Sequence, residues 1–455
     1  MKLKYQRLLY STFFLIFFTI VPVLALYSAG YRYDFKRNRL EKTGILYIES
    51  KPKEAMVYLD GQYKNTTPSR LTKLLPGKYN VEVRKDDYYP WISEVEVKSN
   101  LTTFLKNTVL FRKNLPEIKI KGEINILTIS LDQQKIIYSL VGENNEELRL
   151  FNLKNDSDFL IESFGRKTYN YLEFLAWAPD QSKALFKQVI GDFNKYLIVD
   201  VNTLRVKQIF DITRLNFDKL VWSGKNDSCL YGLRKTMLYQ IDLTRNSTEP
   251  IFAANITDLQ AADDKIYYIT RIASDYYLNQ KLLESEEKDK KIKLPSFSDY
   301  TLQASTSDLI TLLDKNNNDL FIIDSNAFDT QNIEDEIVLQ ARAKNIFWSE
   351  NFKNLIYYTN FELWFYNLDE RQNELLTRYG ETINRAVWYP ENKYIVYQLG
   401  NTIRVTETRS GSIKNDLTLA RLEKINQIVI DEKGDNLYFS GKIGNQQGIF
   451  QLKLQ

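Results

Sequence analysis

The 455-residue chain contains no histidine and only one cysteine. Ser-His-Asp and Cys-His catalysis and His-ligated zinc sites all need an imidazole, so the sequence excludes these classes of chemistry. The single cysteine, Cys229, forms neither an intrachain disulfide nor a multi-cysteine metal site. It lies in an apolar run with Leu230 and Tyr231, which predicts a buried, inert thiol in a strand. We predict no catalytic, cofactor-binding or metal-binding residue.

An excess of charge of one sign is also missing. The 61 basic and 58 acidic residues give a formal net charge of +3, and no dense basic cluster is interleaved with aromatic residues, so nucleic acid is not an expected partner. The chain has only 3 methionines but 30 tyrosines and 25 phenylalanines, which favour half-buried pleated surfaces. Composition and length therefore predict an all-β body of two or three domains.

One long run lacks charge entirely. Residues 8–29 carry no charged side chain, and 22 residues at about 1.5 Å per residue span roughly 33 Å, enough for a hydrocarbon core of about 30 Å. We predict a basic head at 1–7 and a transmembrane helix at 8–30, through which the chain contacts the lipid bilayer. The run exceeds a usual signal-peptide core, and Tyr27 stands where cleavage needs a small residue, so an uncleaved signal-anchor is preferred.

Basic residues flank this span on both sides. Lys2, Lys4 and Arg7 precede it, and five basic residues follow it within 31–43, so the positive-inside count does not favour an outside C-terminus. Long C-terminal domains, however, translocate largely regardless of nearby charge. We expect a single-pass protein of the cell membrane with an extracytoplasmic body.

A linker at 31–43 is expected to lead into a small β-sandwich at 44–113. Strand-like runs there alternate with turn signals, and Tyr79, Val81 and Val83 alternate with polar residues, which indicates one buried and one wet face. We expect an antiparallel sandwich whose last strand runs from about Thr102 to Phe111.

The order of turns in this segment resembles the PEGA domain. The resemblance is carried by Pro52-Lys53-Glu54-Ala55, Asp60-Gly61, Thr67-Pro68, Leu75-Pro76-Gly77-Lys78-Tyr79 and Tyr89-Pro90-Trp91. The chain departs from the family pattern at Glu54, where the tetrad has glycine, and at Tyr88, where glycine is common. The resemblance implies a surface or envelope module that binds or spaces, without catalytic residues. The glycines, prolines and aspartates of these motifs are explained first as turn formers.

Residues 114–455 carry an internal repeat. Strand-like segments ending in Asp or Asn and an apolar residue recur, with looser copies, at 148–153, 196–201, 238–243, 320–325, 363–368 and 449–454. Their spacing is a multiple of roughly 40 to 48 residues, the period of a four-stranded propeller blade. A second phased signal comes from Trp177, Trp222, Trp348 and Trp388, each of which precedes a turn and a strand.

This repeat looks like the TolB-type or WD-like propeller repeat. Segments beginning near 120, 170, 215, 255, 299, 340, 383 and 422 predict about eight blades, with seven possible. The fourth and fifth blades lack the tryptophan. We expect the tryptophans to pack between blades rather than to stack on a ligand.

Two polar stretches invite a functional interpretation. Residues 314–319 alternate oxygen-bearing side chains as calcium loops do, but Asp319 replaces the required glycine and Ser325 the required glutamate, so a polar hairpin is expected. Residues 284–293 form a mixed charge run that predicts a solvated loop.

Two function classes remain open. The first is a membrane-anchored binding or scaffold protein of a bacterial cell envelope, whose propeller presents loops to an envelope protein or a cell-wall glycan. The alternative is a glycosidase or lyase on the propeller, which needs two carboxylates converging on the central channel. The sequence identifies no binding residue for either.

Overall fold

The computed structural model describes residues 2–455 except 36, 131, 284–287, 296–297 and 409–414. These residues form two compact units. The first contains the chain up to Asn114 together with residues 415–417 and 454–455, and the second contains 115–408 and 418–453. The C-terminal residues and the short 415–417 segment therefore belong to the first unit, although the repeat analysis placed them in the propeller.

The chain begins with one long helix, α1 (Lys2–Ser28). Its segment Leu8–Ser28 is long and apolar enough to cross a membrane, and none of it is buried. The Thr12 and Thr19 hydroxyls donate to the Leu8 and Leu15 carbonyls, 2.9 and 2.7 Å away, so polar groups are satisfied within the helix. Intrahelical bonding of this kind is what a lipid environment requires. The helix already includes most of the predicted basic head.

The predicted linker at 31–43 is wrong in one respect, because it contains a β-hairpin. Strand β1 (Tyr31–Asp34) pairs antiparallel with β2 (Arg39–Lys42) in a two-stranded sheet. Aromatic and charged residues alternate in β1, and β2 is mostly charged, a pattern that the sequence alone does not separate from a solvated linker.

Two sheets form the sandwich that follows. One has the order β6-β3-β9 and the other β5-β4-β7-β8. The strands are β3 (Gly44–Lys51), β4 (Met56–Leu59), β5 (Gln62–Thr66), β6 (Ser69–Leu74), β7 (Gly77–Arg84), β8 (Trp91–Val97) and β9 (Thr102–Val109). The core between them includes Leu46, Val57, Val83 and Trp91. The expected all-antiparallel pairing is wrong, because β9 returns alongside β3 in parallel.

In the second unit, the described residues form eight four-stranded sheets. The first four blades are β11 (Glu123–Ile129), β12 (Lys135–Val141), β13 (Asn145–Asn152), β14 (Ser157–Gly165); β15 (Tyr171–Trp177), β16 (Lys183–Ile190), β17 (Phe193–Asp200), β18 (Arg205–Gln208); β19 (Lys219–Trp222), β20 (Cys229–Arg234), β21 (Met237–Asp242), β22 (Ser247–Ala253); and β23 (Ile256–Ala262), β24 (Lys265–Ile272), β25 (Asp275–Leu282), β26 (Lys290–Lys293). The next three are β27 (Tyr300–Leu302), β28 (Leu309–Asp314), β29 (Asp319–Asp324), β30 (Ile337–Arg342); β31 (Asn345–Trp348), β32 (Asn354–Tyr358), β33 (Glu362–Asn367), β34 (Gln372–Arg378); and β35 (Ile383–Trp388), β36 (Tyr394–Leu399), β37 (Thr402–Glu407), β38 (Leu417–Arg421).

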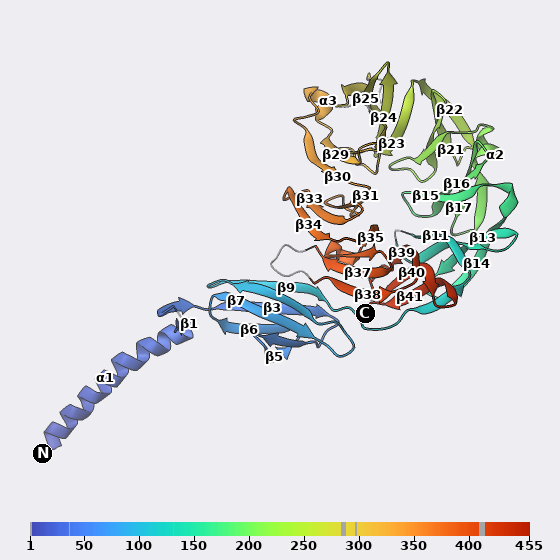
Figure 1. Cartoon of the computed structure of the whole chain (residues 1–455). Helices are drawn as coiled ribbons and strands as arrows, with labels where there is room; N and C mark the ends of the chain where they lie inside the picture. Colours follow the sequence, from blue (N-terminus) through green and yellow to red (C-terminus); the bar gives the residue numbers. More distant parts are fainter. Residues whose placement is uncertain (1, 36, 131, 284–287, 296–297, 409–414) are drawn as a thin grey trace. The chain divides into compact units, whose positions relative to one another are not determined.

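The eighth blade closes the ring. It combines β39 (Lys424–Ile430), β40 (Asn436–Ile443) and β41 (Gln446–Lys453) with β10 (Glu117–Lys121), so the two ends of the repeat share one sheet. Figure 1 shows the blades around a common centre, which their first strands face. The predicted all-β propeller is confirmed, and the residues that the structure describes form eight blades rather than seven. Short helices occur at α2 (Ile209–Thr213), α3 (Ala327–Thr330), η1 (Arg166–Thr168) and η2 (Pro390–Asn392).

The repeated Asp or Asn has a local structural cause. It ends the third strand of a blade, and its side-chain oxygen accepts the backbone N–H two or three residues later, closing the turn. The bonds from Asn202 to Asp200, from Thr244 to Asp242 and from Asn326 to Asp324 measure 3.0, 2.8 and 2.9 Å.

The repeated tryptophans join neighbouring blades, as expected. Each indole N–H donates to the preceding blade: Trp177 to Thr128 Oγ1 at 3.2 Å, Trp222 to the Ala176 carbonyl at 3.4 Å, Trp348 to Thr311 Oγ1 at 3.1 Å and Trp388 to the Phe347 carbonyl at 3.2 Å. The ring packs and the polar edge is satisfied, so these residues fix one blade against the next.

The prediction for the polar stretch 314–319 is confirmed, and that for the charged run 284–293 is wrong in part. Residues 314–319 form the turn between β28 and β29, which confirms the hairpin. In the charged run, residues 290–293 form β26, the outer strand of the fourth blade, so the loop prediction is wrong there. Residues 284–287 lie outside the described residues. Cys229 is buried in β20, as predicted.

Candidate functional site

A cavity of about 810 Å³ lies against the inner strands of the propeller. It is lined by residues of β15, β19, β23 and β27, the first strands of the second to fifth blades, and by the turns that follow two of them. In the third blade this turn contains Gly224, where a Cβ atom would lie 2.2 Å from the Asp263 amide nitrogen of the fourth blade. The glycine therefore permits the close approach of two blades at the cavity edge.

The most deeply buried charged side chain of the cavity is that of Asp258 on β23, which is 5% exposed. One of its carboxylate oxygens pairs with Lys219 Nζ on β19, and the other accepts the Leu302 N–H of β27 at 2.8 Å. Asp258 therefore connects the third, fourth and fifth blades. A carboxylate this deeply buried is stable only when it is paired and hydrogen-bonded, as here.

The cavity's other two carboxylates are also engaged. Glu173 accepts from Lys187 Nζ at 2.7 Å, in an ion pair between β15 and β16 whose carboxylate is 46% exposed. Asp218 accepts the Lys235 N–H at 2.6 Å, and its carbonyl accepts the Tyr196 hydroxyl at 2.9 Å. Burial, with Asp218 and Glu173 nearby, raises the pKa of Tyr196, so this phenol stays protonated.

The remaining lining combines aliphatic side chains, such as Leu220 and Leu233, with aromatic, amide and hydroxyl groups. Trp177 and Trp222 contribute to the wall, with Thr257, Gln260 and Thr301 beside them. Lys315 is exposed at the cavity and has no ion-pair partner among the residues that the structure describes. Such a mixture of aromatic surface, convergent polar groups and one uncommitted cation suits the binding of a polar or anionic ligand.

This arrangement offers binding groups more readily than acid-base groups. A two-carboxylate glycosidase needs one acid and one base or nucleophile facing the sugar, whereas each cavity carboxylate here is held by a lysine or a backbone N–H. Within the described ranges, no group of three or more His, Cys, Asp or Glu side chains is placed to hold a metal ion.

Sequence reasoning assigned a binding role to none of these residues, and it named Trp177 and Trp222 only as residues that pack between blades. Lys219 and Asp258 are 39 residues apart in the sequence and lie in different blades. Only the presence of a charged residue on each of two inner strands could have indicated an ion pair between them. The tryptophans were found because they repeat, whereas the cavity charges occur once each.

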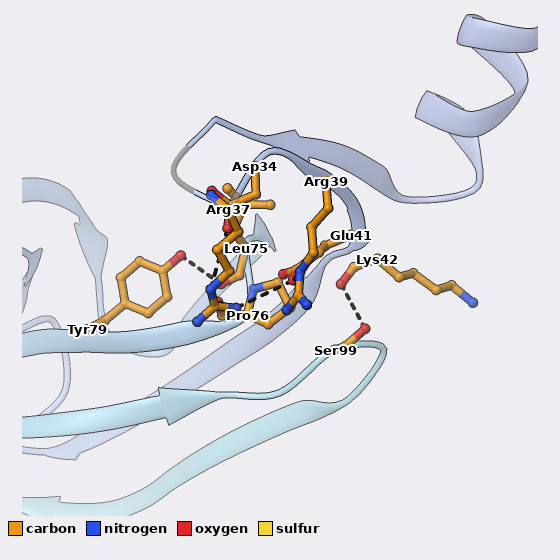
Figure 2. Close-up of polar contacts among 9 residues, drawn as sticks. All are labelled: Asp34, Arg37, Arg39, Glu41, Lys42, Leu75, Pro76, Tyr79 and Ser99. Carbon is orange, nitrogen blue, oxygen red and sulfur yellow. Dashed lines mark hydrogen bonds and ion pairs between the residues drawn. The ribbon is translucent and has the colours of Figure 1, made fainter.

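A second polar cluster holds the β1–β2 hairpin to the sandwich (Figure 2). Arg37 Nη1 lies 3.4 Å from both Glu41 Oε1 and the Pro76 carbonyl, and Arg39 also pairs with Glu41. Ser99 donates to the Lys42 carbonyl at 3.0 Å. The hairpin is thereby fixed to the turn before β7 and to the loop after β8.

Comparison with known families supports the sandwich assignment. The model of the PEGA domain matches residues 43–110, which contain strands β3 to β9. The chain therefore contains a PEGA domain, while the match covers too little of the chain to classify the whole protein. No curated protein sequence matches the chain.

The solved structures that are similar to this chain belong to proteins with different names. Dipeptidyl peptidase 4 of Porphyromonas gingivalis is 9% identical, with 71% of this chain and 56% of the peptidase covered and a TM-score of 0.49. The chain thus spans little more than half of that enzyme. Oligogalacturonate lyase of Vibrio parahaemolyticus is 11% identical over 73% of this chain and 98% of the lyase, with a TM-score of 0.42. Hsv2 of Kluyveromyces lactis is 11% identical over 66% and 99%, with a TM-score of 0.42. None of these similarities indicates an activity.

Proposed function

We propose that this protein is a membrane-anchored, non-enzymatic binding or scaffold protein of a bacterial cell envelope. In this proposal α1 is an uncleaved single-pass anchor, the PEGA domain spaces the propeller from the membrane, and the propeller cavity binds an envelope protein or a cell-wall glycan. The body lies on the extracytoplasmic side.

The observation that carries the proposal is the state of the cavity carboxylates. Glu173, Asp218 and Asp258 are each engaged by a lysine or a backbone N–H, so the site lacks a free pair for acid-base work. What it offers instead is shape, aromatic surface and Lys315, for which the described part of the chain supplies no ion-pair partner. Propellers generally present such cavities and their rims to partners.

The type of helix also favours an anchored protein. Leu8–Ser28 is wholly unburied, so no part of the folded body covers its apolar surface. An apolar helix of this length is most stable in a bilayer. Resistance of the full chain to alkaline carbonate extraction from membranes is the expected result, and an N-terminus beginning after residue 28 would contradict it.

Binding is tested with the full-length protein immobilised in detergent. It is exposed separately to solubilised envelope proteins and to isolated cell-wall glycan fragments, and the same fragments are analysed for chain shortening. The proposal predicts retention of one class without cleavage. Shortened glycan products at a rate above the buffer blank would favour the glycosidase or lyase alternative. Retention of neither class by folded protein would contradict the binding function.

A further inference from the structure

The β1–β2 hairpin follows the apolar helix almost without a gap. α1 ends at Ser28 and β1 begins at Tyr31, so two residues separate them and β1 begins within about 10 Å of the helix end. Arg32 fastens the junction: its Nη1 donates to the Tyr27 carbonyl at 2.9 Å, and its guanidinium lies 3.4 Å from the Tyr27 ring centre. Wherever the helix leaves a bilayer, the hairpin lies at that surface.

The hairpin has two opposite faces. The register pairs Arg32 with Glu41 and Asp34 with Arg39 on one face, and Tyr31 with Lys42 and Tyr33 with Leu40 on the other. The acidic residues Asp34 and Glu41 are only 6% and 9% exposed. They are covered by Arg37 and Arg39 on the side that contacts the PEGA domain (Figure 2).

The other face carries exposed apolar side chains beside Lys42. Tyr33 is 44% exposed, Leu40 48% and Phe35, just after β1, 88%. The Tyr33 and Phe35 rings meet edge to face with centroids 5.0 Å apart, so they form one aromatic surface. Strands that face water normally bury apolar side chains and expose polar ones. This hairpin does the opposite, because it buries its carboxylates and exposes its aromatic rings.

Among the hairpin residues that the structure describes, the exposed charge is of one sign. Residues 31–42 contain five basic and two acidic side chains, and both acidic ones are buried. The Arg37 and Arg39 side chains that cover them are 48% and 61% exposed. The hairpin therefore combines exposed aromatic residues with an outward positive charge, the combination found in segments that lie in the interface of anionic membranes.

We propose that the β1–β2 hairpin is a lipid-docking element, with Tyr33, Phe35 and Leu40 in the headgroup and upper acyl region. The exposed parts of Arg37 and Arg39, which pair with Asp34 and Glu41 on the opposite face, add positive charge near anionic headgroups. The bilayer is the occupant because α1 delivers the hairpin to it. This inference rests on the anchoring part of the proposed function and is independent of which side of the membrane holds the body. In this proposal, the docked hairpin also holds the adjoining end of the PEGA domain at the membrane.

The test places a fluorophore on the hairpin of the full-length chain in liposomes. Phe35→Cys is labelled with a polarity-sensitive nitrobenzoxadiazole, and unmodified protein is the labelling blank because Cys229 is 4% exposed. The matched control is Asp86→Cys, exposed beyond the far end of β7, an eight-residue strand that begins beside Pro76. Lipids with brominated acyl chains quench only a probe that contacts the bilayer.

The inference predicts blue-shifted emission at position 35 and quenching several-fold stronger than at position 86, increasing when phosphatidylglycerol is added. Equal weak quenching at both positions would overturn it. A blue shift without quenching would also overturn it, because the hairpin would then contact protein. Quenching that does not change when phosphatidylglycerol is added would overturn the hairpin's proposed preference for anionic lipids. Carbonate extraction of the same liposomes reports on the anchor, so loss of the anchor and loss of hairpin docking give different results.

Discussion

The hairpin and the propeller blades place their aromatic residues in opposite ways. In the hairpin, Phe35 is exposed and the carboxylates of Asp34 and Glu41 are buried. In the blades, large aromatic residues such as Tyr138, Phe186 and Tyr397 are fully buried, and ion pairs such as Lys353 with Asp369 lie on the surface. The difference is the one that the lipid-docking proposal predicts between strands that fold in water and a hairpin that contacts a bilayer.

The comparison also separates stability from function. Aromatic residues in the blades pack against neighbouring blades and should stabilise the fold, whereas those exposed on the hairpin should contribute almost nothing to it. Substitutions in the two regions therefore have expected effects of very different size.

The largest effect is expected for Trp222→Ala. Trp222 is 7% exposed and packs in a cluster shared by the second and third blades, so truncation leaves a cavity and removes the indole bond to Ala176. We expect a loss of about 3–5 kcal/mol in the free energy of unfolding of the propeller. Denaturant unfolding of the solubilised full chain measures it. Trp177→Ala, at a half-buried position, should cost less, and an unchanged melting temperature for both would refute inter-blade packing.

A smaller but still large effect is expected for Asp258→Ala. The substitution leaves Lys219 and the Leu302 N–H without their partner in a largely buried site. Breaking a pair of this kind costs about 3 kcal/mol. The matched control is Glu173→Ala, which breaks the more exposed pair with Lys187 in the same cavity and should cost at most about 1 kcal/mol. Equal losses for the two variants would show that burial does not set the strength of these contacts.

A pH-dependent effect is expected at Asp314. Burial alone would raise the pKa of Asp314, but hydrogen bonds from Ser298 and from the Asn317 and Asn316 amides outweigh it and lower the pKa. A lowered folded-state pKa stabilises the fold above the unfolded value of about 3.9, and this contribution is lost as pH falls through the lowered pKa. Asp314→Ala should therefore cost about 1.5–3 kcal/mol at pH 7.

The difference between wild type and Asp314→Ala should shrink in acid, when unfolding of both chains is followed from pH 7 to below the lowered pKa of Asp314. A gap that is constant across this range would contradict the assignment of the effect to the ionised carboxylate. The control is Asp319→Ala, at the other end of the same turn. Its side chain is 32% exposed, so its removal should cost less stability than removal of the buried Asp314 carboxylate.

The smallest effect is expected for Phe35→Ala. With 88% of Phe35 exposed, its removal should change the free energy of unfolding in detergent by no more than about 0.5 kcal/mol. A loss as large as that of Trp222→Ala would place Phe35 in a packed core and remove the contrast between hairpin and blades.

Much of the fold could be predicted because its signals are local and repeated. Trp177, Trp222, Trp348 and Trp388 recur at one place in the blade, and the Asp or Asn that ends the third strand recurs because each turn needs the same backbone hydrogen bond. The PEGA turns are equally local. Two features were missed: the parallel pairing of β9 with β3, which depends on a contact between distant segments, and the β1–β2 hairpin, which is local but whose short charged strands have the pattern of a solvated linker.

The candidate site could not be predicted for the same reason. Lys219, Asp258 and Leu302 come from three blades, and nothing in the sequence near any one of them specifies the other two. Lys315 is one exposed lysine among many until the ring places it at the cavity.

The most direct test of the central claim compares ligand retention by wild-type protein with that by the double variant Gln260→Ala, Lys315→Ala. Lys154→Ala, on the β13–β14 turn at the outer side of the first blade, is the control. The account predicts that the double variant loses at least ten-fold in affinity for the retained envelope protein or glycan, while Lys154→Ala binds as wild type does. Equal retention by all three proteins would show that the cavity is not the binding site.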